Sequence, residues 1–473
     1  MTPFIKEIDY IDPSQVLLRL ADEPMLCFLD SAKQQNTLGR YSYIGVNPFL
    51  TIKSKDNLVF INEDEFIGNP FDLLKKHLLN YKGVSVKKLP PFQGGAMGYL
   101  AYDLLHHLEC VPKANKDEIK IPDMYIGFYD CVIAFDYLQQ QAWIISQGFP
   151  EVDKTLRQNR AEDRANWLFK KSFKTSTPKI NVHCEQSAGA DISSNFSLGE
   201  YCDAIQKTIE YINAGDIFQA NITQCFSSSL PDGVSPIELY ITLRVKNPAP
   251  FSAFLNFGDI CIASASPERF ICLQDGMVET RPIKGTRPRG KIAEEDKLLA
   301  NELVNSEKDR AENTMIVDLM RNDLSRVCNA NSVIVTKLCG LESYETVHHL
   351  VSAIEAKLAE GKDAIDLLKA TFPGGSITGA PKVRAMEIIY EIEPSARGAY
   401  CGNIGYIGFD GNMDTSIVIR TYIIKKDRVY FQAGGGIVAD SNPQEEYEES
   451  LTKAYALKKV LQGGEKIGDL VYR

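Results

Sequence analysis

A lysine in a loop rich in proline, glycine and arginine is the first residue whose setting suggests chemistry. Lys284 lies in TRPIKGTRPRG, where Arg281, Arg287 and Arg289 bring positive charge close to it in the sequence. Neighbouring positive charge lowers the pKa of a lysine, and the neutral amine is the form that attacks carbon. The loop therefore predicts a nucleophilic amine, with a solvated surface lysine as the alternative.

A glutamate shortly before that loop could supply a proton. Glu268 lies in SASPERF, sixteen residues before Lys284. A glutamate that is buried can donate a proton to a leaving group at neutral pH. The alternative is a structural ion pair with Arg269 or another arginine.

Two segments place carboxylates on one face of a helix. In KDRAENTMIVDLMRND, Asp309 and Glu312 are three residues apart, and in NPQEEYEESLTK the stripe is Glu446, Glu449 and Lys453. If the two stripes face each other, they form a carboxylate cage of the kind that suits Mg²⁺. The alternatives are ion pairs within the first helix and a solvated face on the second.

A glycine-rich segment offers a weaker signal for an anion site. In FPGGSITGAPKVRAMEII, Pro381 predicts the first position of a helix, with the glycines before it. Backbone N–H groups at such a start bind anions. Lys382 follows Ala-Pro rather than the second glycine, so this is no phosphate-binding Walker loop. Ordinary turn glycines are the alternative.

Helices and strands must hold these residues in place. Ser197 and Glu200 predict a capping box at the start of a helix that ends at Gly215. Asn442 and Pro443 predict the start of the last helix, and a long helical region is expected over 294–327. Alternating apolar residues predict strands in LTIKSKDNLVFI, MYIGFYDCVIAFDY and AWIISQ.

Composition limits the classes of protein. The chain has 473 residues and a net charge of -10, which disfavours nucleic acid and anionic membranes as partners. Its start resembles no signal peptide, and no apolar run is long enough to span a bilayer. The 11 cysteines form no C-x-x-C pair, so reduced thiols and a cytoplasmic location are predicted.

Segments over nearly the whole chain resemble the chorismate-utilising enzymes: anthranilate synthase component I, aminodeoxychorismate synthase component I, and the isochorismate and salicylate synthases. The segments are PFQGGAMGYLAYDL, AGDIFQANITQ, NPAPFSAFL, SPERF, PIKGTRPRG, DRAENTMIVDLMRND, HHLVS, PGGSITGAPKVRAMEII, GNIGYIG, MDTSIVIRT and AGGGIVADS. The resemblance implies an α+β fold, a two-layered antiparallel β-sandwich with helices outside. It implies intertwined halves: an N-terminal region over 1–170, a linker over 171–196 and a chorismate-binding catalytic region over 197–465.

Two positions select a branch of this family. Gln219 stands where the water-using members carry a lysine, which favours ammonia as the nucleophile. Lys284 stands where typical anthranilate synthases carry alanine, and it resembles the nucleophilic lysine of aminodeoxychorismate synthases. The implied reaction is amination of chorismate at C4 for p-aminobenzoate and folate synthesis. The alternatives are anthranilate synthase component I and a non-catalytic chorismate-binding subunit.

The resemblance also implies roles for the site residues. Glu312 and Glu449 would bind Mg²⁺, with Asp309 and Glu446 holding metal-bound waters, although many relatives carry glutamate where this chain has Asp309. Lys284 would attack C2 while Glu268 assists the departing hydroxyl, and His349 would lie under the ring. The remaining contacts to the substrate would come from Gln219, Ser376, Tyr400, Arg420, Gly434, Gly435, Gly436 and Lys453.

The source of ammonia is expected elsewhere. A glutaminase needs a cysteine in a G-x-C-x-G setting, and none of the cysteines has it; Cys401 in AYCGNIG does not fit. A separate glutamine amidotransferase subunit, forming a heterodimer, is therefore implied. FLDSA and RYSYIG, residues 28–32 and 40–45, resemble the tryptophan-binding region of anthranilate synthases, which this branch is expected to keep as a relic.

Overall fold

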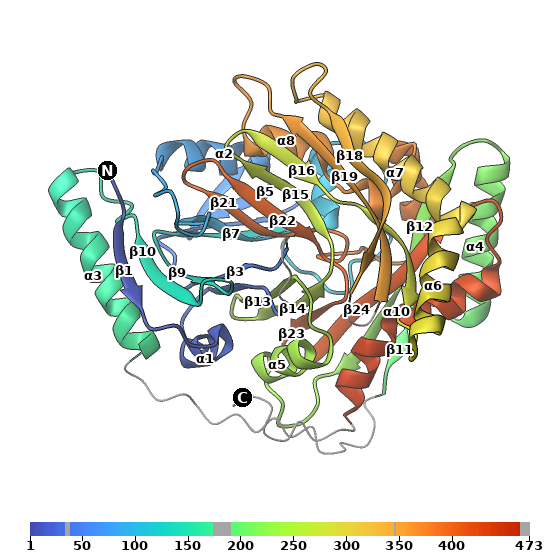
Figure 1. Cartoon of the computed structure of the whole chain (residues 1–473), viewed down its shortest axis with the longest axis horizontal. Helices are drawn as coiled ribbons and strands as arrows, with labels where there is room; N and C mark the ends of the chain where they lie inside the picture. Colours follow the sequence, from blue (N-terminus) through green and yellow to red (C-terminus); the bar gives the residue numbers. More distant parts are fainter. Residues whose placement is uncertain (34–37, 174–190, 345–346, 464–473) are drawn as a thin grey trace.

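Two large antiparallel sheets pack face to face, and helices cover their outer surfaces (Figure 1). The computed structural model describes residues 1–33, 38–173, 191–344 and 347–463. The predicted α+β class and two-layered architecture are confirmed. Most of the predicted linker, residues 174–190, lies outside the described residues, so the predicted domain boundaries stay a prediction.

The first sheet takes strands from both halves of the chain. Its central neighbours are β2 from the first half and β13 from the second, which pair through residues such as Phe28 and Phe254. The strands in spatial order are β1 (Phe4–Ile8), β10 (Gln141–Ser146), β9 (Cys131–Asp136), β3 (Tyr41–Gly45), β2 (Leu26–Asp30), β13 (Phe251–Asn256), β14 (Ile260–Ser266), β23 (Thr421–Lys425), β24 (Arg428–Ile437), β12 (Gln219–Ser229) and β11 (Ser193–Ser194), with β20 (Gly379–Ala380) beside β12.

The second sheet is interleaved in the same way. Here β21 from the second half pairs with β7 from the first, with Gly405 opposite Gly98. The spatial order is β17 (Ile283–Pro288), β19 (Val347–Lys357), β16 (Met277–Thr280), β15 (Arg269–Gln274), β22 (Met413–Ile417), β21 (Asn403–Gly408), β7 (Gly95–Leu100), β8 (Met124–Tyr129), β4 (Leu50–Lys55), β5 (Leu58–Ile61) and β6 (Asp64–Ile67), with β18 (Ile334–Ser343) beside β19.

Apolar side chains fill the space between the sheets and under the helices. The inner layer includes Tyr43 and Val132 of the first sheet and Met97 and Tyr406 of the second. The outer face of the first sheet is covered by α1 (Pro13–Arg19), α3 (Lys154–Phe173), α5 (Pro236–Lys246) and α10 (Pro443–Gln462). That of the second is covered by α2 (Pro70–Asn80), α7 (Glu307–Ser325) and α8 (Ala364–Thr371). The alternation of strand residues thus buries both faces of each sheet.

The predicted helix ends are confirmed where side chains cap them. Helix α4 (Leu198–Asn213) begins with the reciprocal capping box of Ser197 and Glu200, and Gly215 follows its end with φ +83°. Helix α10 begins after Asn442, whose side chain accepts from the N–H groups of Gln444 and Glu445.

Two predicted helix boundaries were wrong. The region 294–327 forms two helices, α6 (Ala293–Asn305) and α7, because Ser306 takes an extended conformation and its hydroxyl accepts from the N–H of Asp309 as the N-cap of α7. Pro381 is the N-cap of α9 (Lys382–Ile392) rather than its first residue. The cap of Ser306 decides where α7 starts, whereas Pro381 has an extended conformation and no side-chain cap bond.

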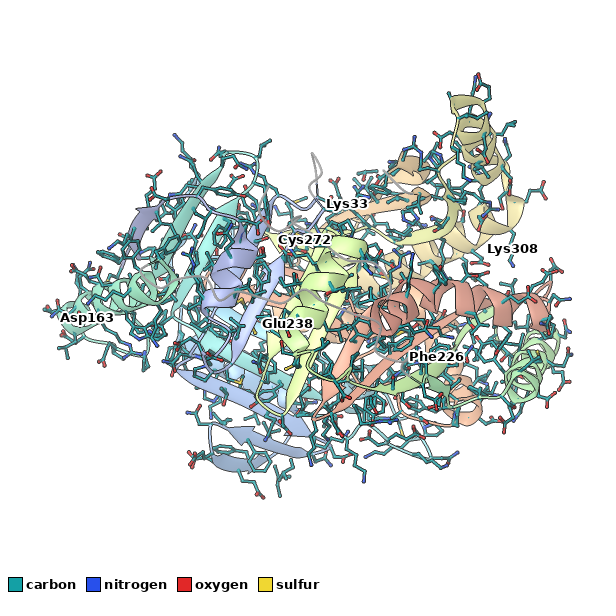
Figure 2. All side chains as sticks on the ribbon, turned by 90° about the horizontal axis from the view of Figure 1, so that it is seen from below. Lys33, Asp163, Phe226, Glu238, Cys272 and Lys308 are labelled. Atoms are coloured by element: carbon teal, nitrogen blue, oxygen red, sulfur yellow. The ribbon has the colours of Figure 1, made fainter. Side chains whose placement is uncertain are left out.

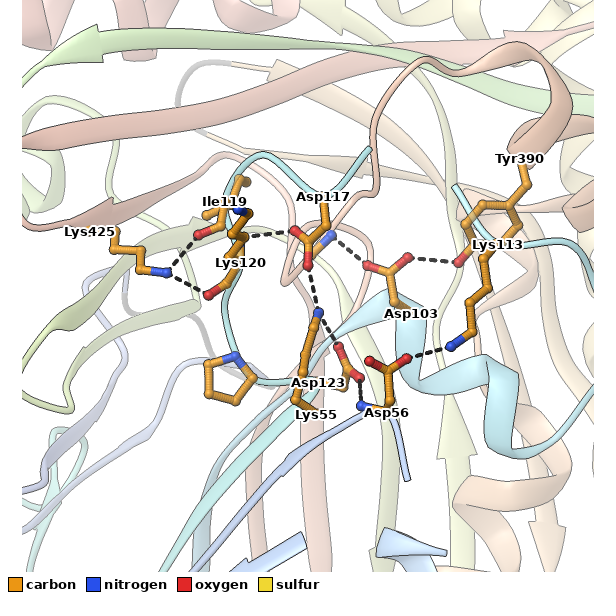
Figure 3. Close-up of polar contacts among 12 residues, drawn as sticks. Lys55, Asp56, Asp103, Lys113, Asp117, Ile119, Lys120, Asp123, Tyr390 and Lys425 are labelled. Atoms are coloured by element: carbon orange, nitrogen blue, oxygen red, sulfur yellow. Dashed lines mark hydrogen bonds and ion pairs between the residues drawn. The ribbon is translucent and has the colours of Figure 1, made fainter. Parts of the chain in front are cut away.

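A polar network joins the segment before β8 to both sheets (Figure 3). Lys55 on β4 lies 2.7 Å from Asp117 and 2.9 Å from Asp123. Lys425 on β23 donates to the carbonyl of Ile119 at 2.9 Å. Since β4 and β23 belong to different sheets, the segment before β8 links the two sheets.

The described helices include none that is long and apolar enough to cross a membrane. All cysteines within the described ranges are free thiols, most of them buried. Burial raises the pKa of several of these thiols, to about 12 for Cys27 and Cys225, so these act as small apolar side chains.

Candidate active site

Lys284 lies inside the molecule, close to helix α7 and to the glycines at the end of strand β24. On β17 it pairs with Leu350 of β19, and its side chain is 12% exposed. Its Nζ lies 3.9 Å from Oε2 of Glu312 on α7. A methyl group on Gly436 would lie 3.3 Å from the same Nζ. The surface-lysine alternative is therefore excluded.

The predicted crowding of positive charge around Lys284 was wrong. Arg281 pairs with Glu342 at 2.5 Å, Arg287 with Glu302 at 2.8 Å, and Arg289 with Asp296 at 2.7 Å. The charge of each arginine is therefore offset by a carboxylate of its own. These acidic partners lie outside the loop that contains the arginines, so the sequence of the loop does not reveal them.

Gln219 lies beside Lys284, where β12 begins. Its side chain is buried, and a methyl group on Gly436 would lie 1.9 Å from its Nε2. Its Oε1 is buried and has no hydrogen-bond partner among the described residues. Only a glycine at 436 leaves room for this amide beside the lysine, so the pocket holds an unpaired acceptor close to the amine.

Glu268 is a buried acid next to the amine. It lies between β14 and β15 and is 6% exposed. Burial raises its pKa to about 7, although a hydrogen bond with Ser376 and the charge of Lys284 act in the opposite direction. The alternative pairing with Arg269 is excluded because that guanidinium bonds to Asp414 and Glu279. Near pH 7, Glu268 can therefore release a proton.

His349 is a neutral histidine on β19. Burial, together with the charge of Arg420, lowers its pKa to about 4. Its Nδ1 lies 2.8 Å from the hydroxyl of Thr286 on β17. The neighbouring His348, predicted to be structural, bonds Ser343 at 2.8 Å and Asp296 at 2.9 Å.

The acidic stripe of α10 faces the glycines of β24, as the sequence predicted, but Gly434, Gly435 and Gly436 belong to the strand and do not form the predicted turn. A methyl group on Gly435 would lie 3.1 Å from Glu446, 3.5 Å from Lys453 and 3.7 Å from Glu449. Lys453 pairs with Glu449 at 2.7 Å and donates to the carbonyl of Gly434 at 3.0 Å. The side chains of Glu446, Glu449 and Lys453 thus lie together, next to the backbone of Gly435.

Helix α7 approaches the same side chains. Lys308 at its start, labelled in Figure 2, lies 3.7 Å from Glu446 of α10. Asp309 pairs with Arg287 at 3.4 Å. Intrahelical pairs, the alternative for these acids, are therefore replaced by contacts between elements.

The carboxylates of α7 and α10 fit a magnesium ion in chemistry. Burial raises the pKa of Glu446 and the charge of Glu449 adds to this effect, whereas Lys453 lowers the pKa of Glu449, helped by Lys284. A dication would relieve the crowding of these acids. Among the described residues no three His, Cys, Asp or Glu side chains form a group that could hold a metal ion, and the predicted carboxylate cage stays a prediction.

For two further predicted site residues, Tyr400 and Arg420, the structure gives neighbours but no contact that defines a role. Tyr400 is buried, and its hydroxyl contacts Cys401. Arg420 is close enough to His349 to lower the pKa of that imidazole. Their predicted contacts with a substrate stay predictions.

The region that resembles a tryptophan-binding site lines a separate cavity of about 490 Å³ between the two sheets. Leu29 and Asp30 of β2, the following Ser31, and Tyr41 and Tyr43 of β3 line it. The cavity lies away from Lys284, and binding of tryptophan there stays a prediction.

Sequence reasoning missed several partners of these residues. Thr286 lies two residues after Lys284 on β17, but the pairing register shifts between them, where Gly285 has φ +80°. Regular strand alternation therefore could not reveal its contact with His349. Ser441 donates to Glu446 at 2.7 Å, and Lys308 bridges α7 to α10. The contact of Lys308 joins elements far apart in the sequence and leaves no local pattern, whereas Ser441 is only five residues before Glu446.

Comparison with known proteins agrees with this geometry. The family model for chorismate binding enzymes matches residues 25–459. Anthranilate synthase component 1 of Acetivibrio thermocellus is 39% identical over 456 residues, covering 94% of this chain and 92% of the relative. Aminodeoxychorismate synthase component 1 of Bacillus subtilis is 38% identical over 433 residues, covering 90% of each.

A solved structure supports the same assignment. Anthranilate synthase component I from Streptococcus pneumoniae superposes with a TM-score of 0.79 at 34% identity, covering 89% of this chain and 92% of that one. Relatives of both names match at similar identity. The chain belongs to the family of chorismate binding enzymes.

Proposed function

We propose that this enzyme aminates chorismate at C4 to give 4-amino-4-deoxychorismate. The observation that carries the proposal is a buried lysine amine, 3.9 Å from Glu312, in a pocket that also holds Glu268 with a pKa of about 7. A buried amine beside a proton donor is the equipment for covalent catalysis followed by loss of a hydroxyl.

Lys284 and Glu268 would carry the first half of the reaction. The neutral amine forms a bond to C2 of the ring, the ring double bonds shift, and the C4–O bond breaks. Glu268 gives its proton to the departing oxygen, which leaves as water. Its pKa near neutrality lets it both hold and release that proton.

Ammonia would complete the exchange. It adds at C4, the double bonds return, and the C2–N bond breaks to release Lys284. The proton that ammonia loses restores Glu268, so the net change is chorismate plus ammonia to product plus water. The Oε1 of Gln219, which has no hydrogen-bond partner among the described residues, would accept from the incoming nitrogen. The enolpyruvyl group is untouched, unlike in an anthranilate synthase.

The other residues would bind and orient the substrate. Glu312 and Glu449 would hold Mg²⁺, with Asp309 and Glu446 behind them, and the ion would fix the ring carboxylate and offset its charge when bound. His349, neutral at pH 7, would lie at the ring without adding charge. The ammonia would come from a separate glutamine amidotransferase subunit.

A product assay tests the proposal. The protein is incubated with chorismate, Mg²⁺ and ammonium, and the products are separated by mass. We expect a product that keeps the enolpyruvyl group, and Lys284→Ala should remove most of it, whereas Lys53→Ala on β4 should not. Formation of anthranilate would instead assign the chain to anthranilate synthase component I, and full activity of Lys284→Ala would remove the covalent step.

A further inference from the structure

A fully buried ion pair lies behind the candidate active site. Arg397 is 1% exposed and Glu393, four residues earlier, is 5% exposed. The guanidinium donates twice to the carboxylate, from Nε at 2.9 Å and from Nη2 at 2.7 Å. Its face lies 4.6 Å from the ring of Tyr102. Removing two charges from water costs free energy. The other contacts of the pair therefore indicate which role offsets this cost.

Arg397 and Glu393 contact three separate segments of the chain. Arg397 donates from Nη1 to the carbonyl of Ile377 at 2.9 Å and from Nη2 to that of Asn221 at 2.5 Å. Glu393 accepts from the N–H of Thr223 at 2.9 Å. The carbonyl of Arg397 accepts from Gln432 at 2.8 Å. The guanidinium therefore ties a short 3₁₀ turn to strand β12, and the backbone carbonyl of the same residue binds a side chain of strand β24.

Each of these segments carries a residue of the site. Ile377 directly follows Ser376, the hydrogen-bond partner of Glu268. Asn221 is two residues beyond Gln219 on β12, so the two side chains lie on one face of that strand. Gln432 is two residues before Gly434, the first of the three glycines of β24. The three segments come from distant parts of the chain. They also contact one another directly, since β12 pairs with β24 and the N–H of Asn221 donates to the carbonyl of Thr378. The buried pair adds a second set of bonds to these contacts.

We propose that Arg397 and Glu393 form a positioning pair, which sets the place of Ser376 against Glu268 and of Gln219 against Lys284. The inference rests on the proposed function of those four residues. The planar guanidinium uses its donors in fixed directions, so it fixes distances that a lysine cannot reproduce. Misplacement of a catalytic group by about 1 Å costs on the order of 100-fold in rate.

The test uses Arg397→Lys in the full chain, with consumption of chorismate as the readout. We expect kcat to fall about 100-fold. The alkaline limb of the pH profile should move to higher pH, because the hydrogen bond from Ser376 holds the pKa of Glu268 down. A variant that only lost stability would lower the rate in proportion to the folded fraction and leave that limb in place.

A second buried ion pair provides a matched control. Arg244 pairs with the buried Asp30 at 2.7 Å, remote from Lys284. Arg244→Lys should reduce stability without moving the pH limb. Glu393→Gln keeps the shape of the pair and serves if Arg397→Lys does not fold; it should move the limb in the same direction.

Crystal structures of the variants complete the test. The proposal expects Ser376 and Gln219 to be displaced in Arg397→Lys or Glu393→Gln and unmoved in Arg244→Lys. An unshifted pH limb, or both side chains in their original places, would overturn it. Because loss of chorismate is followed whatever the product, and the displacement is read from coordinates, a failure of the proposed amination stays distinguishable from a failure of this inference.

Discussion

Replacing Glu268 with glutamine should stabilise the protein at alkaline pH while it removes activity. In the folded protein the pKa of this carboxyl is about 7, against 4.5 for an unperturbed glutamic acid. The folded state therefore holds the proton more tightly than the unfolded state. Below about pH 4.5 both states are protonated, and above about pH 7 both are charged, so folding loses free energy as pH rises between them.

The magnitude follows from the two pKa values. A difference of about 2.5 pH units at about 1.4 kcal/mol each gives about 3 kcal/mol. Glutamine carries no charge and keeps a group that can bond Ser376, so Glu268→Gln avoids this loss. The difference in free energy of unfolding between variant and wild type should grow by about 3 kcal/mol from about pH 4.5 to about pH 8.

Urea titrations of the wild type and of Glu268→Gln at both pH values measure the difference in their free energies of unfolding. The effects of the other titrating groups are common to the two proteins and cancel in this difference. Glu360→Gln, at an exposed position, is the control and should show the same small difference at both. Turnover of Glu268→Gln should fall by about 10²- to 10⁴-fold. A stability difference that does not change with pH would refute the reasoning, because Glu268 would then not hold a proton in the folded state.

Three further predictions concern the same pocket. Gly436→Ala should lower turnover at least about 100-fold with the fold intact, because the added methyl group would lie 1.9 Å from the buried Gln219 amide; Gly68→Ala, which meets nothing within 4 Å, is the control, and equal activity of the two would contradict the crowding. The NMR signals of His349 should titrate near pH 4 and stay constant from about pH 6 to 8; a transition near the ordinary histidine value would count against a neutral ring. Glu449→Gln should weaken Mg²⁺ binding about tenfold or more in calorimetry, and unchanged affinity would exclude that carboxylate as a ligand.

Much of the fold could be predicted because its signals are local. Capping residues such as Ser197 and Asn442 announce helix starts, and strand alternation is visible over 50–61 and 124–137. The break at Ser306 was missed because a serine inside a helical pattern is compatible with either one helix or two. Which strands pair across the two halves depends on contacts such as Phe28 with Phe254, and no local pattern records them.

The site could be predicted where it rests on residue type, and not where it depends on distant partners. The stripe of Glu446, Glu449 and Lys453 follows from helical spacing. The pairing of Arg281 with Glu342 could not be foreseen, and it overturned the expectation of positive charge around Lys284. The burial that raises the pKa of Glu268 likewise comes from the packed core.

The most direct test of a nucleophilic Lys284 is the mass of the protein after mixing with chorismate and Mg²⁺ in the absence of any ammonia donor. The account predicts an added mass equal to chorismate less one water, located on the peptide that contains Lys284 and absent from Lys284→Ala. Absence of this adduct in a preparation that converts chorismate once ammonium is added, or an adduct on another residue, would contradict it.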